Sequence, residues 1–382
     1  MLLAIETSCD ETAMALLECK GGLRRPQFKI LAEVVSSQIP IHRPFGGVVP
    51  NLAKREHIKN LPIVYRKIFH QLNYLRDRED SLVDKKDKPD LLAVTVGPGL
   101  EPALWAGITF AQELGKKLKV PVIGANHLEG HIYSNWLPAN SPKDFNNSAI
   151  AELLKIKFPA VCLIVSGGHT ILLLMKSLTK WEILGETRDD AVGEAFDKVA
   201  RMLNLPYPGG PEVEKLAKSY KLKTKSLINF PRPMIHDNNY EFSFSGLKTA
   251  VLYYLRDNFN MRTSDIPKIK RNAWISDVQK ICASFQKAAI DVLTHKTMKA
   301  VGEFKAKSVL LCGGVACNKA LQKEFRTKIK ILSPRSYTLN PKFFVPDKKF
   351  NTDNAVMIAA AAYINYLKKK KYPLEAQGNL CI

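Results

Sequence analysis

The chain of 382 residues is 46% hydrophobic and 24% charged, which is typical of a folded globular protein with one large domain or two moderate ones. No apolar stretch reaches the roughly 18 residues that a membrane-spanning helix requires, so a membrane protein is not expected. A strand is predicted from Leu2 onward, and nothing before it resembles a targeting segment. We therefore expect a cytoplasmic protein.

Basic residues are in excess, because 57 lysines and arginines stand against 36 acidic residues and give a formal net charge of +21. They cluster at Lys215 to Lys225, at Lys268 to Arg271 and at Lys368 to Lys371. An excess of this size favours a polyanionic partner such as nucleic acid. A host whose proteins are all rich in lysine would give the same excess, so charge alone leaves both explanations open.

The seven cysteines lie mostly inside apolar runs, and no two of them have CxxC spacing. This pattern argues against a zinc ribbon and against a redox dithiol. We expect buried, reduced thiols.

Along the chain, the first pattern is strand, polar turn, strand over residues 1–18, with a turn at Glu6 to Thr12 that is rich in hydroxyls and acids. The pattern returns over residues 160–176, where Ser166 to His169 form the turn. This recurrence predicts an internal duplication in which each half opens with a hairpin.

Strands and helices alternate in the remaining chain. Strands are predicted over 91–96, 120–125 and 308–311, and helices over 103–118, 316–325 and 355–367. Such alternation predicts an α/β fold whose mixed sheets are covered by helices. Three polar or charged stretches, 76–88, 138–147 and 218–239, are expected to be surface excursions.

Two histidines, His127 and His131, follow the predicted strand at 120–125 and are four residues apart. On a helix this spacing puts both within reach of one metal ion, although pairs at helical spacing also arise by chance. Asp353, just before the last predicted helix, is a candidate third ligand; it is equally explained as an acid at a helix N-terminus. Two histidines and one carboxylate with open positions suit Fe(II) or Zn(II).

Two glycine turns follow predicted strands, at Ser166-Gly167-Gly168 and at Gly313-Gly314. Their missing side chains let backbone N–H groups approach an anion, and the second turn opens a helix whose N-terminus favours phosphate. Each turn alone is ordinary, but with the polar turn at Glu6 to Thr12 they predict a nucleotide held between the two halves. Asp197 and Glu214, near a Pro-Gly-Gly-Pro turn, are either ribose-binding acids or solvated helix acids.

Nine motifs occur in the order found in one protein family: IETSCDET, FGGVVPNLAKREH, VTVGPGL, NHLEGHI, VSGGHT, GEAFDKVARMLNLPYPGGP, FSFSGLKTA, CGGVACN and TDNAVMIA. From Leu2 to about Leu367 the chain resembles the TsaD family, the tRNA N6-adenosine threonylcarbamoyltransferases, formerly described as O-sialoglycoprotein endopeptidases. The resemblance implies a single catalytic unit with the two-lobed ASKHA fold of actin, Hsp70 and the sugar kinases. One lobe would comprise about residues 1–132 plus a C-terminal helix at 353–371, and the other about residues 133–352.

The resemblance also implies site residues, position by position. The family's metal ligands, for one Fe(II) per subunit with Zn(II) as the alternative, correspond to His127, His131 and Asp353. Its substrate-binding positions correspond to Ile164, Val165, Ser166, Gly167, Gly168, Asp197, Gly210, Glu214 and Asn318. The implied donor is threonylcarbamoyl-AMP, in the cleft that takes ATP or AMP. The implied acceptor is N6 of adenosine 37 in tRNAs that read ANN codons, and the metal polarises the carbonyl without a covalent enzyme intermediate.

Partners are implied as well. Bacterial members act with a catalytically silent paralogue, TsaB, and an ATPase, TsaE, after a threonylcarbamoyl-AMP synthase; mitochondrial members act as homodimers. Ile164 and His169 stand where archaeal and eukaryotic relatives carry tyrosine and asparagine, so the chain is closer to the bacterial branch. The stretch 138–159 is longer than usual and LEPALWAG is an unusual form of its segment, departures that concern partner contacts more than catalysis.

Three other classes of protein share some of these features. A non-catalytic ASKHA scaffold of the TsaB type is expected to lack the metal ligands, which this chain keeps. A metalloprotease of the HExxH type needs a glutamate directly after the first histidine, where this chain has Leu128. A small-molecule kinase needs a carboxylate base facing the terminal phosphate, and the sequence identifies none.

Overall fold

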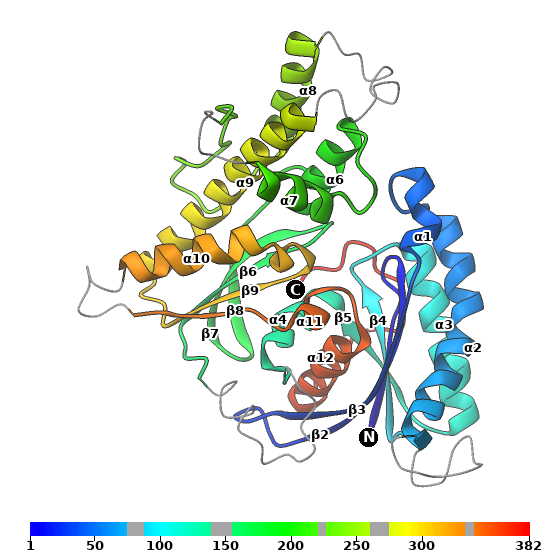
Figure 1. The fold of residues 1–382 in the computed structure, drawn as a ribbon. Coiled ribbons are helices and arrows are strands. Elements are labelled where there is room, and N and C mark those ends of the chain that lie inside the picture. The colour runs from blue at the N-terminus through cyan, green and yellow to red at the C-terminus, as the bar shows by residue number, and fades with distance from the viewer. Residues whose placement is uncertain (75–87, 139–154, 221–226, 260–274, 333–339) are drawn as a thin grey trace. The chain divides into compact units, whose positions relative to one another are not determined.

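The computed structural model describes residues 1–74, 88–138, 155–220, 227–259, 275–332 and 340–382 (Figure 1). The chain forms two compact units, one from residues 1–155 and 346–382 and the other from residues 156–345. The first unit therefore extends beyond the boundaries at 132 and 353 that the sequence suggested, and it includes the end of the chain.

The elements of each unit follow in chain order. The first unit contains β1 (Leu2–Glu6), β2 (Glu11–Lys20), β3 (Gln27–Ser37), α1 (Ile39–His42), η1 (Arg43–Phe45), α2 (Pro50–Tyr74), β4 (Leu91–Gly97), α3 (Glu101–Leu118), β5 (Val122–Asn126), α4 (His127–Tyr133), η2 (Ser134–Trp136), α11 (Lys348–Asn351) and α12 (Ala355–Lys368). The second contains β6 (Ala160–Val165), β7 (Thr170–Ser177), β8 (Lys180–Glu186), α6 (Val192–Met202), α7 (Gly209–Ser219), α8 (Ser245–Phe259), α9 (Ile275–Glu303), β9 (Ser308–Cys312), η5 (Gly314–Cys317), α10 (Lys319–Leu332) and β10 (Lys342–Phe344).

The two sheets have the same topology. The first has the order β3-β2-β1-β4-β5, and the second has the order β8-β7-β6-β9-β10 when read from the corresponding edge. In each, the opening strand is antiparallel to its hairpin partner and parallel to the strand on its other side: β1 with β2 and β4, and β6 with β7 and β9. The matching order confirms the internal duplication and the mixed α/β sheets.

In the first unit, alternate residues of the strands serve two different layers. Leu3 and Ile5 of β1 join the core beneath α2 and α3. Ala4 points to the opposite face, and the alanines 359–362 of α12 are fully buried where that helix lies along the sheet (Figure 1). Small side chains on both surfaces let α12 lie close to the strands, which fixes the position of Asp353 just before it.

In the second unit, Val161, Leu163 and Val165 of β6 pack into one core with α6, α8 and α9. The register pairs Leu163 with Leu311 and Ile164 with Cys312. Because β6 and β9 are parallel neighbours, their carboxyl ends lie side by side, and both glycine turns begin there.

The helix predicted at 316–325 was placed wrongly. The chain forms the single turn η5 first, and α10 begins at Lys319 and continues to Leu332. Asn318 separates the two, with extended backbone and a side-chain Oδ1 that accepts from Leu321 N at 3.0 Å. An asparagine in this role is a helix N-cap, and its position marks the true start of the helix.

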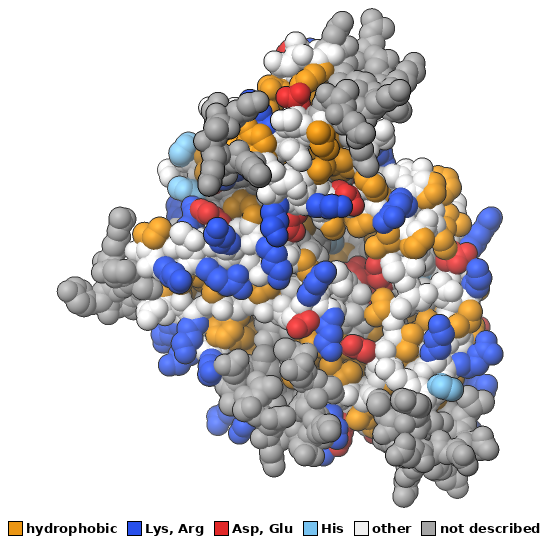
Figure 2. Space-filling view, viewed as in Figure 1, with side chains coloured by type: hydrophobic (Ala, Val, Ile, Leu, Met, Phe, Trp, Pro, Cys, Tyr) orange, Lys and Arg blue, Asp and Glu red, His pale blue; other side chains and the backbone are white. Residues whose placement is uncertain are grey.

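Lysine and arginine side chains are spread over much of the visible surface (Figure 2). The basic clusters predicted at Lys221, Lys223 and Lys225 and at Lys268, Lys270 and Arg271 lie outside the described residues. Within the described ranges, no helix combines the length and apolar character needed to cross a bilayer.

Candidate functional site

The two histidines lie on a short helix, as the sequence predicted. α4 begins at His127 directly after β5, because the Asn126 side chain caps it by accepting from Leu128 N at 2.8 Å and from Glu129 N at 3.1 Å. His127 and His131 are 6% and 0% exposed. The helix therefore holds both imidazoles in the interior of the first unit.

Asp353 reaches the histidines because α4 and α12 pack closely. A Cβ at Gly130 of α4 would lie 3.1 Å from Met357 Cγ and 3.2 Å from Ile358 Cδ1, both on α12. Asn354 caps α12 by accepting from Met357 N at 2.9 Å. The missing side chain at Gly130 and this cap set Asp353 opposite the two rings.

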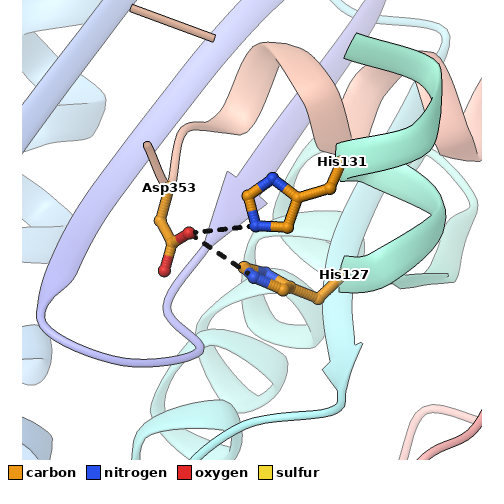
Figure 3. A group of neighbouring side chains, drawn as sticks. All are labelled: His127, His131 and Asp353. Atoms are coloured by element: carbon orange, nitrogen blue, oxygen red, sulfur yellow. Dashed lines mark ion pairs between the residues drawn. The ribbon is translucent and has the colours of Figure 1, made fainter. Parts of the chain in front are cut away.

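The three side chains converge on one point (Figure 3). Asp353 Oδ1 lies 3.5 Å from Nε2 of His127 and 3.4 Å from Nε2 of His131. Ligand atoms of all three residues lie within 4.8 Å of one another. Ligands bound tetrahedrally at about 2.1 Å are about 3.4 Å apart, so these separations fit a single metal ion.

The hydrogen bonding of His131 also fits a metal. Its ring is fully buried, yet among the described residues neither Nδ1 nor Nε2 has a hydrogen-bond partner. A buried nitrogen without a partner is costly, and a cation beside Nε2 would relieve that cost. We conclude that the group can hold a metal ion, as predicted.

Glu129 does not take the place of a protease glutamate. It is fully buried, and its carboxylate accepts from Asn365 Nδ2 and, at 2.8 Å, from Lys370 Nζ. Through these contacts Glu129 binds the end of α12 and the segment after it. This structural role agrees with Leu128 in arguing against an HExxH protease.

Glu6 is a site residue that the sequence reasoning missed. Its buried carboxylate accepts from Ser8 N at 2.5 Å and from Thr95 Oγ1 at 2.6 Å, and it lies 3.2 Å from His127 Nδ1. Ser8 Oγ lies at 3.2 Å from the same nitrogen. A carboxylate behind a metal-binding histidine fixes the ring so that its other nitrogen faces the ion.

The electrostatics of the group follow from burial and the two carboxylates. Burial lowers the pKa of His127, but Asp353 and Glu6 outweigh it and raise that pKa to about 9. Burial also lowers the pKa of His131, and the nearby carboxylate of Asp353 offsets this only in part. Burial raises the pKa of Glu6, but His127 beside it lowers the pKa overall. A cation that binds Nε2 of His127 must therefore displace a proton from this imidazole, whose protonated form the two carboxylates stabilise.

In the second unit, the two glycine turns touch. A Cβ at Gly313 would lie 2.3 Å from Val165 O, and the backbone there has φ +94°, which favours glycine. The Ser166 side chain closes its own turn, because Oγ accepts from His169 N at 3.1 Å. This role leaves Ser166 as a turn residue rather than a nucleophile.

Four glycines of this region face open space: a Cβ would meet no atom within 4 Å at Gly167, Gly168, Gly210 and Gly314. We call these four residues the open glycines. The turn that holds Gly167 and Gly168 packs against α6, because Gly193 N donates to Ser166 O at 3.2 Å. Bare backbone at strand ends and helix starts is what an anionic ligand requires.

The predicted ribose acids and Asn318 hold this region together. Asp197 Oδ1 accepts from Gly209 N at 2.7 Å, and Glu214 Oε1 accepts from Lys319 N at 2.6 Å. Asn318 Nδ2 donates to Gln286 Oε1 at 2.7 Å. Each acid thus binds a backbone N–H at the start of a helix, so neither is merely a solvated helix acid.

Ile164 and Val165 occupy the end of β6 with buried side chains. Val165 belongs to the core of its unit, and Ile164 pairs with Ile171 and Cys312 in the sheet. A ligand beyond this strand would therefore meet the turn that follows rather than the Val165 side chain.

The fold and the site residues define an α/β protein that is built on a duplicated mixed sheet and carries a side-chain group able to hold a metal ion. A family model described as TsaD, tRNA N6-adenosine threonylcarbamoyltransferase, matches residues 29–360. Curated relatives with that name include one from Thermosipho africanus, 43% identical over the whole of both chains. Another, from Syntrophomonas wolfei, is 40% identical over 98% of this chain and 95% of its own. The chain belongs to the TsaD family and is a transferase.

A solved structure supports the fold. HypF from T. kodakarensis aligns with 97% of this chain over 48% of its own length, with 14% identity and a TM-score of 0.50. At this identity the likeness concerns the fold alone, and it agrees with the duplicated mixed sheets of the ASKHA type.

Proposed function

We propose that this chain transfers the threonylcarbamoyl group from threonylcarbamoyl-AMP to N6 of adenosine 37 in tRNAs that read ANN codons. The observation that carries the proposal is the buried group of His127, His131 and Asp353, whose separations fit one metal ion. A non-catalytic scaffold on the same fold would have no reason to keep such a group. Membership of the TsaD family supplies the substrate class.

The reaction is an acyl transfer. The N6 amine attacks the carbamoyl carbon of the mixed anhydride, a C–N bond forms, and the C–O bond to the AMP phosphate breaks as N6 loses a proton. Fe(II), or alternatively Zn(II), held by the two histidines and Asp353 would polarise the carbonyl as a Lewis acid. AMP is a good leaving group, so correct orientation of donor and acceptor supplies much of the remaining rate.

In this proposal the second unit binds the adenylate. The backbone N–H groups at the open glycines would face its phosphate, because no atom of the described residues lies within 4 Å of a Cβ placed at any of them. Asn318 would contact the adenosine, and Asp197 and Glu214 would accept hydrogen bonds from ribose hydroxyls while they hold the starts of α7 and α10.

We further propose that the chain acts in the cytoplasm with a TsaB-like paralogue and a TsaE-like ATPase. On the first unit, α2 and α3 expose Ile58, Ile63 and Trp105 to 54%, 37% and 43%. A groove nearby is lined by Tyr65, Phe69 and other side chains of these two helices. Large exposed apolar side chains on adjacent helices suit a protein partner. A second copy of this chain is the other occupant to test.

The experiment combines metal-loaded protein, its partners, threonylcarbamoyl-AMP and an unmodified tRNA transcript, and then analyses the nucleosides of the digested tRNA. Threonylcarbamoyladenosine should appear only when the chain is present. If the chain binds the adenylate but no modified nucleoside forms, the scaffold is the correct class.

A further inference from the structure

α10 carries five basic residues and one acidic residue. Its inner side is made by Leu321, Phe325 and Ile329, which are buried. Four of its basic residues are exposed and, at 100° per residue, fall within about 60° of arc on one side of the helix. We call them the α10 stripe: Lys319, Lys323, Arg326 and Lys330. Figure 2 shows basic side chains gathered along this helix.

No acid among the described residues pairs with the stripe. Glu324, the single acid of α10, lies off the stripe and 4.0 Å from Lys328. Some exposed lysines elsewhere in the second unit do have an acidic partner, as Lys176 has in Glu182 at 2.7 Å. Among the salt bridges of the described residues, none involves a member of the stripe. Within the described part of the chain, the stripe is therefore a row of positive charge without an acidic partner.

The spacing of the row suits a polyanion. Consecutive members are three or four residues apart, about one helical turn of 5.4 Å, and the row is about 16 Å long. Arg326 lies over the Phe343 ring at 5.5 Å, which limits the motion of its guanidinium. Evenly spaced cations along a rigid helix match a chain of phosphates, whereas the core of a protein interface is poor in lysine.

The row begins at the candidate adenylate site. Lys319 directly follows Asn318, and its backbone N–H donates to Glu214 Oε1 at 2.6 Å. From there the stripe runs along α10, away from the open glycines. A nucleic acid that presents one nucleoside near that site has a track for its backbone along this helix.

We propose that the α10 stripe binds the sugar-phosphate backbone of the tRNA substrate. The inference rests on the proposed function, because it takes tRNA as the acceptor. It assigns a contact to residues that belong to neither the metal group nor the open glycines.

The test compares two triple variants that remove the same charges. K323Q/R326Q/K330Q removes two lysines and one arginine from the stripe, and K176Q/K180Q/R256Q removes two lysines and one arginine from β7, β8 and α8. Affinity for an unmodified tRNA transcript is measured at several salt concentrations, and adenylate affinity and thermal stability are measured alongside. Each lost phosphate contact reduces the slope of log Kd against log salt by about 0.7 to 0.9.

In the stripe variant, the slope of log Kd against log salt should be smaller by about two to three. This variant should bind tRNA at least about tenfold more weakly at low salt, and its adenylate affinity should be unchanged. The control should bind tRNA as the wild type does. K323Q alone should lower the slope by about one, which keeps the test valid if the triple variant folds poorly. Equal slopes for both triple variants and the wild type would overturn the proposed role of the stripe and leave the proposed function standing. A wild type with no affinity for tRNA would overturn the proposed function as well.

Discussion

His127 is held on both sides of its ring. Nδ1 faces Glu6 and Ser8, each at 3.2 Å, and Nε2 faces Asp353 at 3.5 Å. His131 also faces Asp353 through Nε2, at 3.4 Å, but among the described residues its Nδ1 has no hydrogen-bond partner that would fix the ring from behind. The two histidines thus differ in role: one is fixed by the fold, and the other depends more on the ion.

Removal of both histidines should empty the metal site. In H127A/H131A a single carboxylate remains, which is too few ligands to hold the ion, so metal content should fall from about one per chain to near zero and transfer should stop. Metal analysis and circular dichroism measure both effects. His70→Ala on the exposed side of α2 is the control and should keep its metal. Full metal content in the double variant would place the ion elsewhere.

Glu6→Gln should weaken metal binding while preserving the volume of the side chain. The amide keeps a hydrogen-bonding group near His127 but removes the charge that supports the ring, and losses of this kind cost about 10- to 100-fold in metal affinity. Competition with a chelator measures the affinity. Glu129→Gln removes a buried carboxylate from α4, the helix that carries both histidines, without touching either imidazole, and its metal affinity should stay as in the wild type. Equal affinities for Glu6→Gln and wild type would remove Glu6 from the site.

The sequence could predict His127, His131 and Asp353 because local spacing and family motifs mark them. It could not predict Glu6 as a site residue. The contact joins positions 121 residues apart and exists only because β1 lies beside β4, which brings Thr95 and Glu6 together at the strand ends.

At the scale of elements, Asp197 of α6 binds the start of α7, and Glu214 of α7 binds the start of α10. The open glycines leave the backbone bare in this region. Gly314→Ala should therefore leave thermal stability nearly unchanged, since the new methyl group meets no atom within 4 Å. It should weaken adenylate binding at least about tenfold, roughly 1.4 kcal/mol, if the ligand occupies that space. Calorimetric titration measures the affinity.

Gly302→Ala on α9 is the matched control. A Cβ there also meets open space, and no role in ligand binding is assigned to that helix end. Its adenylate affinity should equal that of the wild type. Unchanged affinity in Gly314→Ala would move the adenylate away from the second glycine turn.

The segment before α6 carries an ionic contact whose effect depends on pH. Asp190 accepts from Lys198 Nζ and from Lys248 Nζ, each at 2.7 Å, and so joins α6 to α8. Burial raises the pKa of Asp190, but the hydrogen bonds to the two lysines outweigh it and lower that pKa below its usual 3.8. A lowered pKa means that the charged form stabilises the fold. This contribution is complete above pH 3.8 and is lost as the pH falls through the lowered pKa.

Asp190→Asn should reduce the free energy of unfolding by about 2 kcal/mol at neutral pH. The difference from the wild type should shrink once the pH falls below the usual aspartate range, because both proteins then lack the charge. Urea unfolding at a series of pH values measures it. A difference that stays constant down to acid pH would show that the ion pairs carry no stability.

The start of α10 shows why element boundaries are harder to predict than elements. The apolar run before the Gly313-Gly314 break was recognised as a strand, and a helix was expected from Ala316. The chain instead makes one tight turn, in which Ala316 N donates to Gly313 O at 2.9 Å, before Asn318 caps α10. Asn318 is a residue type that commonly caps helices, so the sequence contains this signal. The turn before it depends on the contact between Gly313 and Val165, which are far apart in sequence.

At the scale of the whole molecule, the duplication was predictable because each half repeats the same hairpin, and both sheets then have one strand order. The limits of the units could not be predicted from local patterns, and only the family resemblance placed the C-terminal helix with the first lobe. The chain returns to the first unit at residue 346, and α12 covers a sheet whose first strand lies at the other end of the sequence. Local patterns cannot show which sheet a distant helix will cover.

The basic excess of +21 is likewise a property of the whole chain. Basic residues are close together in sequence at 215–225, 268–271 and 368–371, whereas those of the α10 stripe are dispersed in sequence and are brought together only by the helix. Whether Lys221, Lys223 and Lys225 contact RNA stays a prediction. Their triple alanine variant should flatten the salt dependence of tRNA binding and leave adenylate binding unchanged.

The most direct test of the proposed transfer is a single-turnover reaction. Metal-loaded protein with its partners is mixed with threonylcarbamoyl-AMP that carries ¹³C at the carbamoyl carbon and with excess unmodified tRNA, and AMP and labelled nucleoside are counted together. We expect one AMP for each labelled threonylcarbamoyladenosine, and neither product from H127A/H131A. Release of AMP without label in the tRNA would contradict acyl transfer and would make the chain a hydrolase of the adenylate.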